Sequence, residues 1–173
     1  MSWVFDSTPL IYLCKVSLSW IFKELSGEKI IPEAVFEQVV SRGKERGEGD
    51  AFLVEQLIKD RVLTVEEVSD GSGTVFKAME EELHEGEIDV LRLAMEKKGI
   101  AITDEGIARE IGEMFGVEVH GTFYLIFLMI AKGKMTKSDA KIKMEEMIKK
   151  GWRVGHEQYL EFVELLESMS SSA

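Results

Sequence analysis

The fold is decided by the stretch Trp3-Val4-Phe5-Asp6-Ser7-Thr8-Pro9-Leu10-Ile11, in which an apolar run ends abruptly at an aspartate. Hydroxyl side chains follow at once, and Pro9 then opens a helical pattern, since proline is favoured in the first turn of a helix. In an open parallel sheet, ligands collect just beyond the carboxyl ends of the strands. We therefore expect Asp6 either to face such a ligand or simply to cap the first helix, which Asp, Ser and Thr all do well.

Short apolar runs alternate with helical patterns along the rest of the chain. The runs typical of strands lie at residues 29–31, 62–65, 100–103 and 117–119. Apolar residues at helical spacing predict helices over residues 10–25, 32–41, 51–59, 74–83, 87–97, 105–115, 122–131, 138–150 and 157–168. Glycine and charged residues predict loops over residues 43–50 and 69–73.

This alternation favours right-handed βαβ crossovers. The predicted fold is therefore α/β, a three-layer α/β/α sandwich with a mostly parallel central sheet. At 173 residues the chain is long enough for one domain with a sizeable core, which we place at residues 1–167. A serine-rich tail, residues 168–173, is expected to be disordered.

The composition, 45% hydrophobic and 31% charged, is typical of a folded protein. The single cysteine, Cys14, excludes an internal disulfide and fits a reducing compartment, so we expect a cytoplasmic protein. No signal-peptide pattern is found, and the most apolar run, residues 123–131, has about half the length that a membrane-spanning helix needs. A membrane partner is therefore not expected. The absence of Asn and the abundance of Glu and Lys indicate a thermophilic source.

A formal net charge of −11 argues against a protein that coats nucleic acid without specificity, because phosphate repels an acidic surface. Residues 132–153 are the exception, because basic side chains there outnumber acidic ones. This basic flank is compatible with nucleic acid approaching from one side. Taken by itself, the flank is explained more simply by a solvated helix with alternating charges.

A second junction, Ile102-Thr103-Asp104-Glu105, repeats the pattern of an apolar strand followed by an acid and a helix. Neighbouring parallel strands would bring Asp6 and Asp104 together, and Glu87 adds a third acid in the first turn of a helix. Carboxylates gathered in one cleft repel one another unless a cation neutralises them. Oxygen ligands without Cys or His suit Mg²⁺ or Mn²⁺, which activate water and stabilise charge on a phosphoryl group.

These motifs stand in the order seen in PIN-domain proteins. The segments that carry the resemblance are Asp6-Ser7-Thr8-Pro9-Leu10-Ile11, the helix at residues 32–40, Gly86-Glu87 through Leu93-Ala94, Thr103-Asp104-Glu105 through Arg109, and Gly121-Thr122. The chain resembles most the archaeal and bacterial branch similar to VapC toxins, from Trp3 to about Leu166. The resemblance implies a metal-dependent endoribonuclease acting on RNA. It is also compatible with the toxin of a toxin–antitoxin pair, with an antitoxin partner and with a homodimer.

The resemblance further implies acidic residues at four positions, and Asp6, Glu87 and Asp104 match three of them. At the fourth position this chain has Gln38, with Glu37 beside it. At 100° per residue, positions 37 and 38 lie equally far from the centre of the apolar helix face, so helix geometry does not choose between them. Either Glu37 turns inward or Gln38 serves as a neutral oxygen ligand, in which case metal affinity falls.

We assign Asp6, Glu87 and Asp104 to holding the metal ions, with one of them or Glu37 orienting the attacking water. The predicted catalytic set is thus Asp6, Glu37, Glu87 and Asp104, and the metal set is Asp6, Glu87, Asp104 and either Glu37 or Gln38. The weaker candidates are Ser7 and Thr8 for a phosphate or metal-bound water, Arg109 and Thr122 for phosphate, and Asp89 and Glu105 as further acids.

Two other functions remain open at this point. The departure at Gln38 favours a catalytically silent PIN-like module that binds RNA or a protein without cutting. A phospho-acceptor or small-nucleotide domain that uses Asp6 and Asp104, as receiver-like folds do, ranks below it because no lysine stands convincingly near a strand end.

Overall fold

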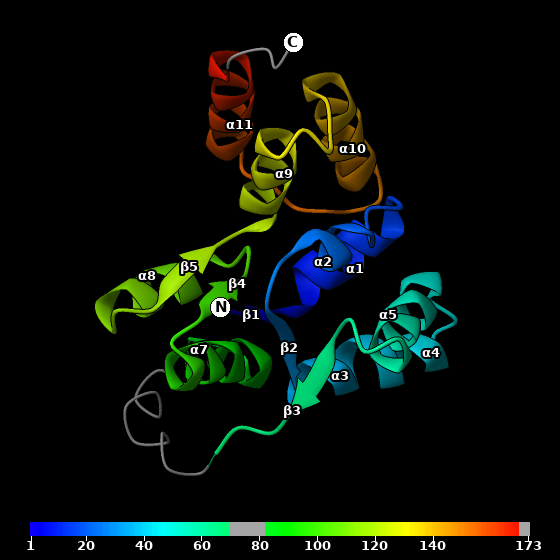
Figure 1. The fold of residues 1–173 in the computed structure, drawn as a ribbon, viewed down its shortest axis with the longest axis vertical. Coiled ribbons are helices and arrows are strands. Elements are labelled where there is room, and N and C mark those ends of the chain that lie inside the picture. The colour runs from blue at the N-terminus through cyan, green and yellow to red at the C-terminus, as the bar shows by residue number, and fades with distance from the viewer. Residues whose placement is uncertain (70–81, 170–173) are drawn as a thin grey trace.

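The structure is a computed structural model that describes residues 1–69 and 82–169 (Figure 1). Its centre is a five-stranded sheet with the strand order β3-β2-β1-β4-β5, in which every pair is parallel. The strands are β1 (Ser2–Phe5), β2 (Glu28–Pro32), β3 (Thr64–Glu66), β4 (Ile100–Ile102) and β5 (Glu118–His120). A parallel sheet flanked by helices confirms the predicted α/β fold.

Strand β1 lies in the middle of the sheet. This position suits it because it has apolar side chains on both faces of the sheet. Val4 and Phe5 are completely buried, as a strand covered by helices on both sides requires. Val4 stands opposite Ile30 of β2 and Ala101 of β4. The carboxyl ends of β1 and β4 therefore lie next to each other.

The helices in the described residues cover this sheet and its ends. They are α1 (Ser7–Lys15), α2 (Ile21–Glu24), α3 (Glu33–Phe36), the π-helical turn η1 (Glu37–Ser41), α4 (Arg42–Glu45), α5 (Gly49–Lys59), α7 (Glu85–Lys97), α8 (Gly106–Met114), α9 (Thr122–Ala131), α10 (Lys137–Lys149) and α11 (His156–Ser168). Helix α7 packs against β1, β2 and β4, and α8 packs against β5. Figure 1 shows α9, α10 and α11 grouped at one end of the molecule, opposite α7 and α3.

The single helix predicted over residues 10–25 is wrong, because the chain forms two helices there. Helix α1 ends at Lys15, and Ser17 adopts a left-handed backbone conformation with φ 61°. The Leu18 N–H then donates to the Leu13 carbonyl (2.8 Å), which closes the end of the helix. Leu18 is buried in this turn, and the separate helix α2 that follows buries Ile21 and Phe22.

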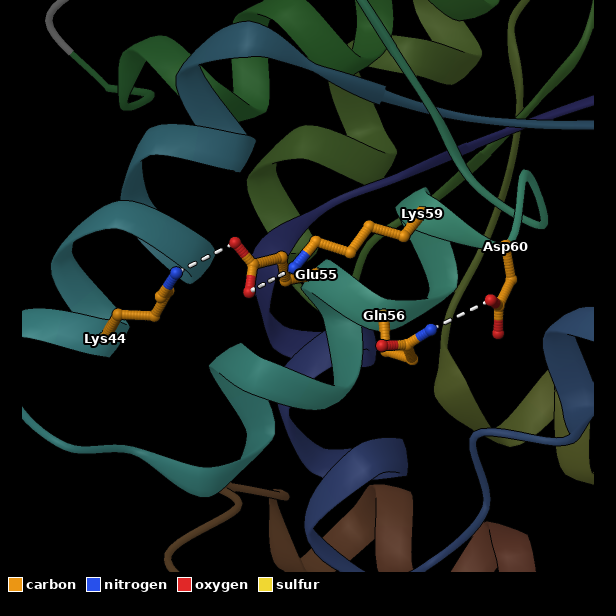
Figure 2. A network of polar contacts seen from close by, with 5 residues as sticks. All are labelled: Lys44, Glu55, Gln56, Lys59 and Asp60. Atoms are coloured by element: carbon orange, nitrogen blue, oxygen red, sulfur yellow. Dashed lines mark hydrogen bonds and ion pairs between the residues drawn. The ribbon is translucent and has the colours of Figure 1, made fainter.

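The loop predicted over residues 43–50 is also wrong over most of its length. Helix α4 continues to Glu45 and α5 begins at Gly49. A Cβ atom on Gly43 would lie 2.8 Å from the Cβ of Ala51, so this glycine permits the close approach of the two helices. Figure 2 shows the polar contacts on their outer side, where Lys44 pairs with Glu55 (2.8 Å).

Three sequence predictions lie wholly or largely outside the described residues. They are the loop at residues 69–73, the helix at residues 74–83 and most of the serine-rich tail. Within the described ranges, no helix has both the length and the apolar character needed to cross a bilayer.

Gly99, which precedes β4, is expected to tolerate no side chain. A Cβ atom there would lie 2.5 Å from the carbonyl oxygen of Ser2, so Gly99→Ala must push β4 away from β1. We expect the substitution to lower the free energy of unfolding by about 1–3 kcal/mol. The matched control is Gly106→Ala, because a Cβ atom at Gly106 meets nothing within 4 Å. Urea unfolding followed by circular dichroism measures both, and equal midpoints for the two variants would contradict the prediction.

Candidate active site

Asp6 follows β1 directly and is buried, with 3% of its surface exposed. Its Oδ1 accepts a hydrogen bond from the Ser7 N–H (2.7 Å), which caps α1. Its Oδ2 accepts one from the Thr103 hydroxyl (2.7 Å) at the end of β4. Asp6 thus caps the first helix and also stands at the carboxyl ends of the two neighbouring strands, so the two roles considered for it coexist.

Burial raises the pKa of Asp6 above its ordinary value. The hydrogen bonds from Thr103 and Ser7 act in the opposite direction, and the negative charges of Asp104 and Glu105 raise the pKa further. The folded chain therefore disfavours the charged form of this carboxylate at the carboxyl end of the central strand. Groups with perturbed pKa values concentrate at functional sites.

Asp6 opens into a pocket of about 410 Å³, here called the acidic pocket. The residues that line it are Asp6, Ser7, Ala34, Glu37, Gln38, Arg42, His84, Glu85, Gly86 and Glu87. They come from the end of β1, from the continuous helical segment α3–η1–α4 and from the start of α7. A Cβ atom on Gly86 would lie 3.4 Å from Val35 Cγ2 and 3.7 Å from Gln38 Oε1, so the glycine lets α7 approach this segment.

Glu37 and Gln38 both line the acidic pocket, and both have exposed side chains. They lie in the π-helical turn η1, which interrupts the α-helical phase between α3 and α4. Turns of this kind are rare and occur frequently at functional sites. The calculation at 100° per residue assumed a regular α-helix, and the π turn removes that assumption.

Glu87 reaches the same pocket from the first turn of α7. Its Oε2 accepts a hydrogen bond from the His84 N–H (2.9 Å), so it also caps the helix. Partial burial raises the pKa of Glu87, the His84 hydrogen bond lowers it, and the charges of Asp6 and Glu105 raise it again. Asp6 and Glu87 are therefore coupled carboxylates in one pocket.

Asp104 has a different environment and does not line the acidic pocket. Its Oδ1 accepts from the Thr122 N–H (2.7 Å), and its Oδ2 accepts from the Thr122 hydroxyl (2.7 Å) and from the Trp152 indole N–H (3.1 Å). It thereby caps α9, and it lines a second pocket. The charge of Asp104 still raises the pKa of Asp6, so it remains within electrostatic reach of the acidic pocket.

The neighbouring Glu105 is exposed and acts on both coupled acids. Its charge raises the pKa of Asp6 and of Glu87. The Glu105 N–H donates to the Thr103 hydroxyl (3.2 Å), which in turn donates to Asp6. Glu105 thus acts electrostatically on both acids, although it does not itself line the acidic pocket.

The weaker candidates are divided between several places. Ser7 lines the acidic pocket next to Asp6, and Thr8 follows it in α1. Arg109 and Asp104 line the second pocket, and Thr122 is held by Asp104. Asp89 lines a third pocket, where it pairs with Arg92 (3.7 Å) and where burial raises its pKa.

Sequence reasoning missed three polar residues of the acidic pocket, Arg42, His84 and Glu85. Arg42 directly follows the π-helical turn η1. The helix predicted over residues 32–41 ended one residue before it. His84 precedes Glu87 by three residues, at the position of a helix cap.

The donors of the acidic pocket fit a hard divalent cation in their chemistry. Carboxylate oxygens from Asp6 and Glu87 are joined by the amide oxygen of Gln38, and oxygen ligands of this kind suit Mg²⁺ or Mn²⁺ rather than zinc. Each carboxylate oxygen has two lone pairs, so the hydrogen bonds of Asp6 leave capacity for a ligand bond. Among the described residues, however, no three Asp, Glu, His or Cys side chains are already arranged to hold a metal ion.

Comparison with known proteins now identifies the family. A family model described as DUF3368, a PIN domain, matches residues 2–168, so this chain belongs to the PIN-domain family. The crystal structure of PAE2754 from Pyrobaculum aerophilum is similar, with a TM-score of 0.50 and 13% sequence identity, over 76% of this chain and 99% of that one. At this identity the likeness shows the fold alone. No curated protein matches the sequence.

Asp6→Asn is expected to stabilise the metal-free protein at neutral pH. Because the pKa of Asp6 is raised on folding, the folded chain binds that proton more tightly than the unfolded chain does, and the free energy of unfolding falls as the pH rises through this pKa. Asparagine removes the buried charge and still caps a helix. Urea unfolding in EDTA should show the largest gain over wild type at pH 7 and little gain below about pH 4.

The control for this measurement is Asp60→Asn, because Asp60 is exposed at the end of α5, where it accepts a hydrogen bond from Gln56 (2.9 Å; Figure 2). We expect this variant to follow the wild type at every pH. A protein with Asp6→Asn that is less stable than wild type at pH 7 would show that the Asp6 charge is compensated in the folded chain.

Proposed function

We propose that this protein is a Mg²⁺- or Mn²⁺-dependent endoribonuclease that hydrolyses phosphodiester bonds in RNA. The observation that carries the proposal is the buried Asp6 at the end of the central strand, sharing the acidic pocket with Glu37, Gln38 and Glu87 in a PIN-domain chain. The coupled carboxylates of this pocket are destabilised by burial and by one another, which is the condition that a divalent cation relieves.

Asp6 and Glu87 would hold the metal in the pocket. When bound, the ion supplies an activated water and stabilises negative charge on the phosphoryl group. Ser7 lines the pocket beside Asp6, where its hydroxyl can bind the substrate phosphate, and Thr8 is a further candidate for this contact. Arg42 lines the same pocket and offers a positive charge to the phosphate.

The third acid comes from the segment after β4, where Asp104 and Glu105 are both candidates. Asp104 accepts three hydrogen bonds from Thr122 and Trp152, which orient its carboxylate. Glu105 has an exposed side chain, and its charge raises the pKa of both Asp6 and Glu87. Neither residue lines the acidic pocket, so we keep Asp104 as the predicted ligand and Glu105 as the alternative from the same segment.

The fourth ligand would come from η1. Gln38 has its amide oxygen near the start of α7, since that atom lies 3.7 Å from the position of a Cβ on Gly86. Glu37 lines the same pocket and offers a charged alternative that can also orient the attacking water. A neutral ligand at this position would lower metal affinity relative to four carboxylates.

The proposal extends to the biological setting that the VapC-like motif order suggests. In this setting the protein is a cytoplasmic toxin from a thermophile, acts as a homodimer and is held by an antitoxin. The second candidate function is a catalytically silent PIN-like module that binds RNA or a protein. Gln38 favours it, because three carboxylates with a neutral fourth ligand hold the metal less tightly.

Cleavage of a single-stranded RNA separates these two functions. We expect cutting in Mn²⁺, none in EDTA, and a loss of at least about a hundredfold in rate for Asp6→Asn, since that substitution removes a charge that faces the metal. Asp60→Asn is the matched control and should cut at the wild-type rate. An EDTA-resistant activity that survives Asp6→Asn would be a contaminant and would defeat the enzyme proposal.

Gln38→Glu is expected to raise the affinity for Mn²⁺ roughly tenfold, because it adds a fourth carboxylate to the pocket. The readout is the rise in the midpoint of thermal unfolding as Mn²⁺ is added, which reports binding to the folded chain without any need for activity. Glu105→Gln should weaken the same response. If Gln38→Glu has no effect and Glu37→Gln abolishes the response, Glu37 is the fourth ligand instead.

A further inference from the structure

The second pocket, here called the aromatic pocket, has no role in holding a metal. It has a volume of about 410 Å³, and it lies among α8, β5, α9, α11 and the segment before α11. The residues that matter for its chemistry are Arg109, His120, Phe123, Tyr124, Trp152 and Arg153. Its volume lies in the range of small-molecule and cofactor sites, which is roughly 300–1,000 Å³.

The aromatic walls of this pocket are fixed before any ligand arrives. His120 and Tyr124 stack with their ring centroids 3.8 Å apart and their planes 7° apart. Phe123 meets Trp152 edge-on at 5.0 Å, and the Trp152 indole N–H is held by Asp104. Tyr124 and Phe123 line the pocket and stay half-buried, and one face of each ring is covered by a stacked neighbour, His120 or Phe162.

Two arginines line the same pocket together with three acids, which are Asp104, Glu113 and Glu161. Arg109 and Arg153 both line it with exposed side chains, and neither forms an ion pair with a described residue. Gln158 lines it too, and its Oε1 caps α11 by accepting from the Gly155 N–H (3.2 Å), which leaves the amide NH₂ as a donor. Flat rings, guanidinium groups and an amide together are the groups that bind unpaired nucleobases and their phosphates.

The aromatic pocket adjoins the acidic pocket through three consecutive residues. Thr103 donates to Asp6 of the acidic pocket, Asp104 lines the aromatic pocket, and Glu105 is coupled to Glu87. The segment that follows β4 thus contributes Asp104 to the aromatic pocket and a hydrogen bond to Asp6 of the acidic pocket. This shared segment is the observation that leads us to consider one nucleic-acid strand at both pockets.

We propose that the aromatic pocket binds one unpaired nucleobase of the RNA strand whose phosphodiester lies at the acidic pocket. This inference rests on the proposed ribonuclease function and names how its substrate is held. The base stacks against the Tyr124 side of the pocket, and Arg109 and Arg153 contact the phosphates on either side of it. The pocket thus selects single-stranded RNA, because a paired base is not free to enter.

Binding of short RNA in EDTA tests this without any cleavage. Fluorescence anisotropy would compare a labelled single-stranded hexanucleotide with six versions, each lacking the base at one position. The backbone charge is the same throughout. We expect one or two positions at which loss of the base weakens binding at least about tenfold, the effect of losing base–aromatic stacking. Equal affinity for all seven strands would overturn the proposal.

Variants of the pocket give a second, independent measurement. Arg153→Glu reverses an exposed charge at the pocket, and we expect it to weaken binding of the intact strand at least about tenfold. Lys23→Glu is the matched control, since Lys23 is an exposed residue of α2 that lies outside both the pocket and the basic flank. Tyr124→Ala should abolish the difference between intact and base-free strands. Equal losses for Arg153→Glu and Lys23→Glu would contradict a specific site.

The two proposals fail in different ways. If the wild-type protein cuts RNA in Mn²⁺ but binds all seven strands equally, the ribonuclease stands and the base pocket falls. If the base dependence is found and no cutting occurs, the pocket stands and the catalytic proposal falls. If Tyr124→Ala changes the oligomeric state and leaves RNA binding unchanged, the aromatic pocket is a contact between copies of the chain, and the proposal is overturned.

Discussion

The hydrogen bond from the Thr103 hydroxyl to Asp6 connects the two strand ends on which the candidate active site is built. It links the ends of β1 and β4, which the parallel register already places side by side. Because Asp6 is buried, loss of that donor would leave one oxygen of its carboxylate without the hydrogen bond that offsets its burial, which is a costly defect in a folded protein. The same hydroxyl accepts from the Glu105 N–H, so one side chain sets both the central acid and the start of the segment that follows β4.

The architecture could be predicted from the sequence because its strands are short, continuous and apolar. Such runs have few alternatives to a sheet that is buried on both faces, and the helices between them require parallel crossovers. The errors arose where a single residue changed the local geometry. Ser17 adopts a left-handed backbone conformation that the surrounding sequence does not predict. Gly43 permits close packing of two helices in a segment whose glycine and charged residues had predicted a loop.

The candidate site was predictable to the extent that it depends on strand ends and helix starts. Asp6 follows an apolar strand and Glu87 opens a helix, so both could be found from local pattern, and the pocket contains both. The choice between Glu37 and Gln38 could not be made, because the π-helical turn that presents them has no recognised sequence signature. The environment of Asp104 was equally hidden, since its partners lie 18 and 48 residues away in the chain.

Asp104 also bears on how related sequences should be interpreted. Its hydrogen bonds to Thr122 and Trp152 attach the C-terminal helices to the sheet, so folding alone gives a reason to keep an aspartate here. A homologue that has lost its catalysis would still be selected to retain this residue together with its threonine and tryptophan partners. Retention of the aspartate in an alignment is therefore not by itself evidence of catalysis, and enzymatic competence has to be judged together with the residues around Asp6.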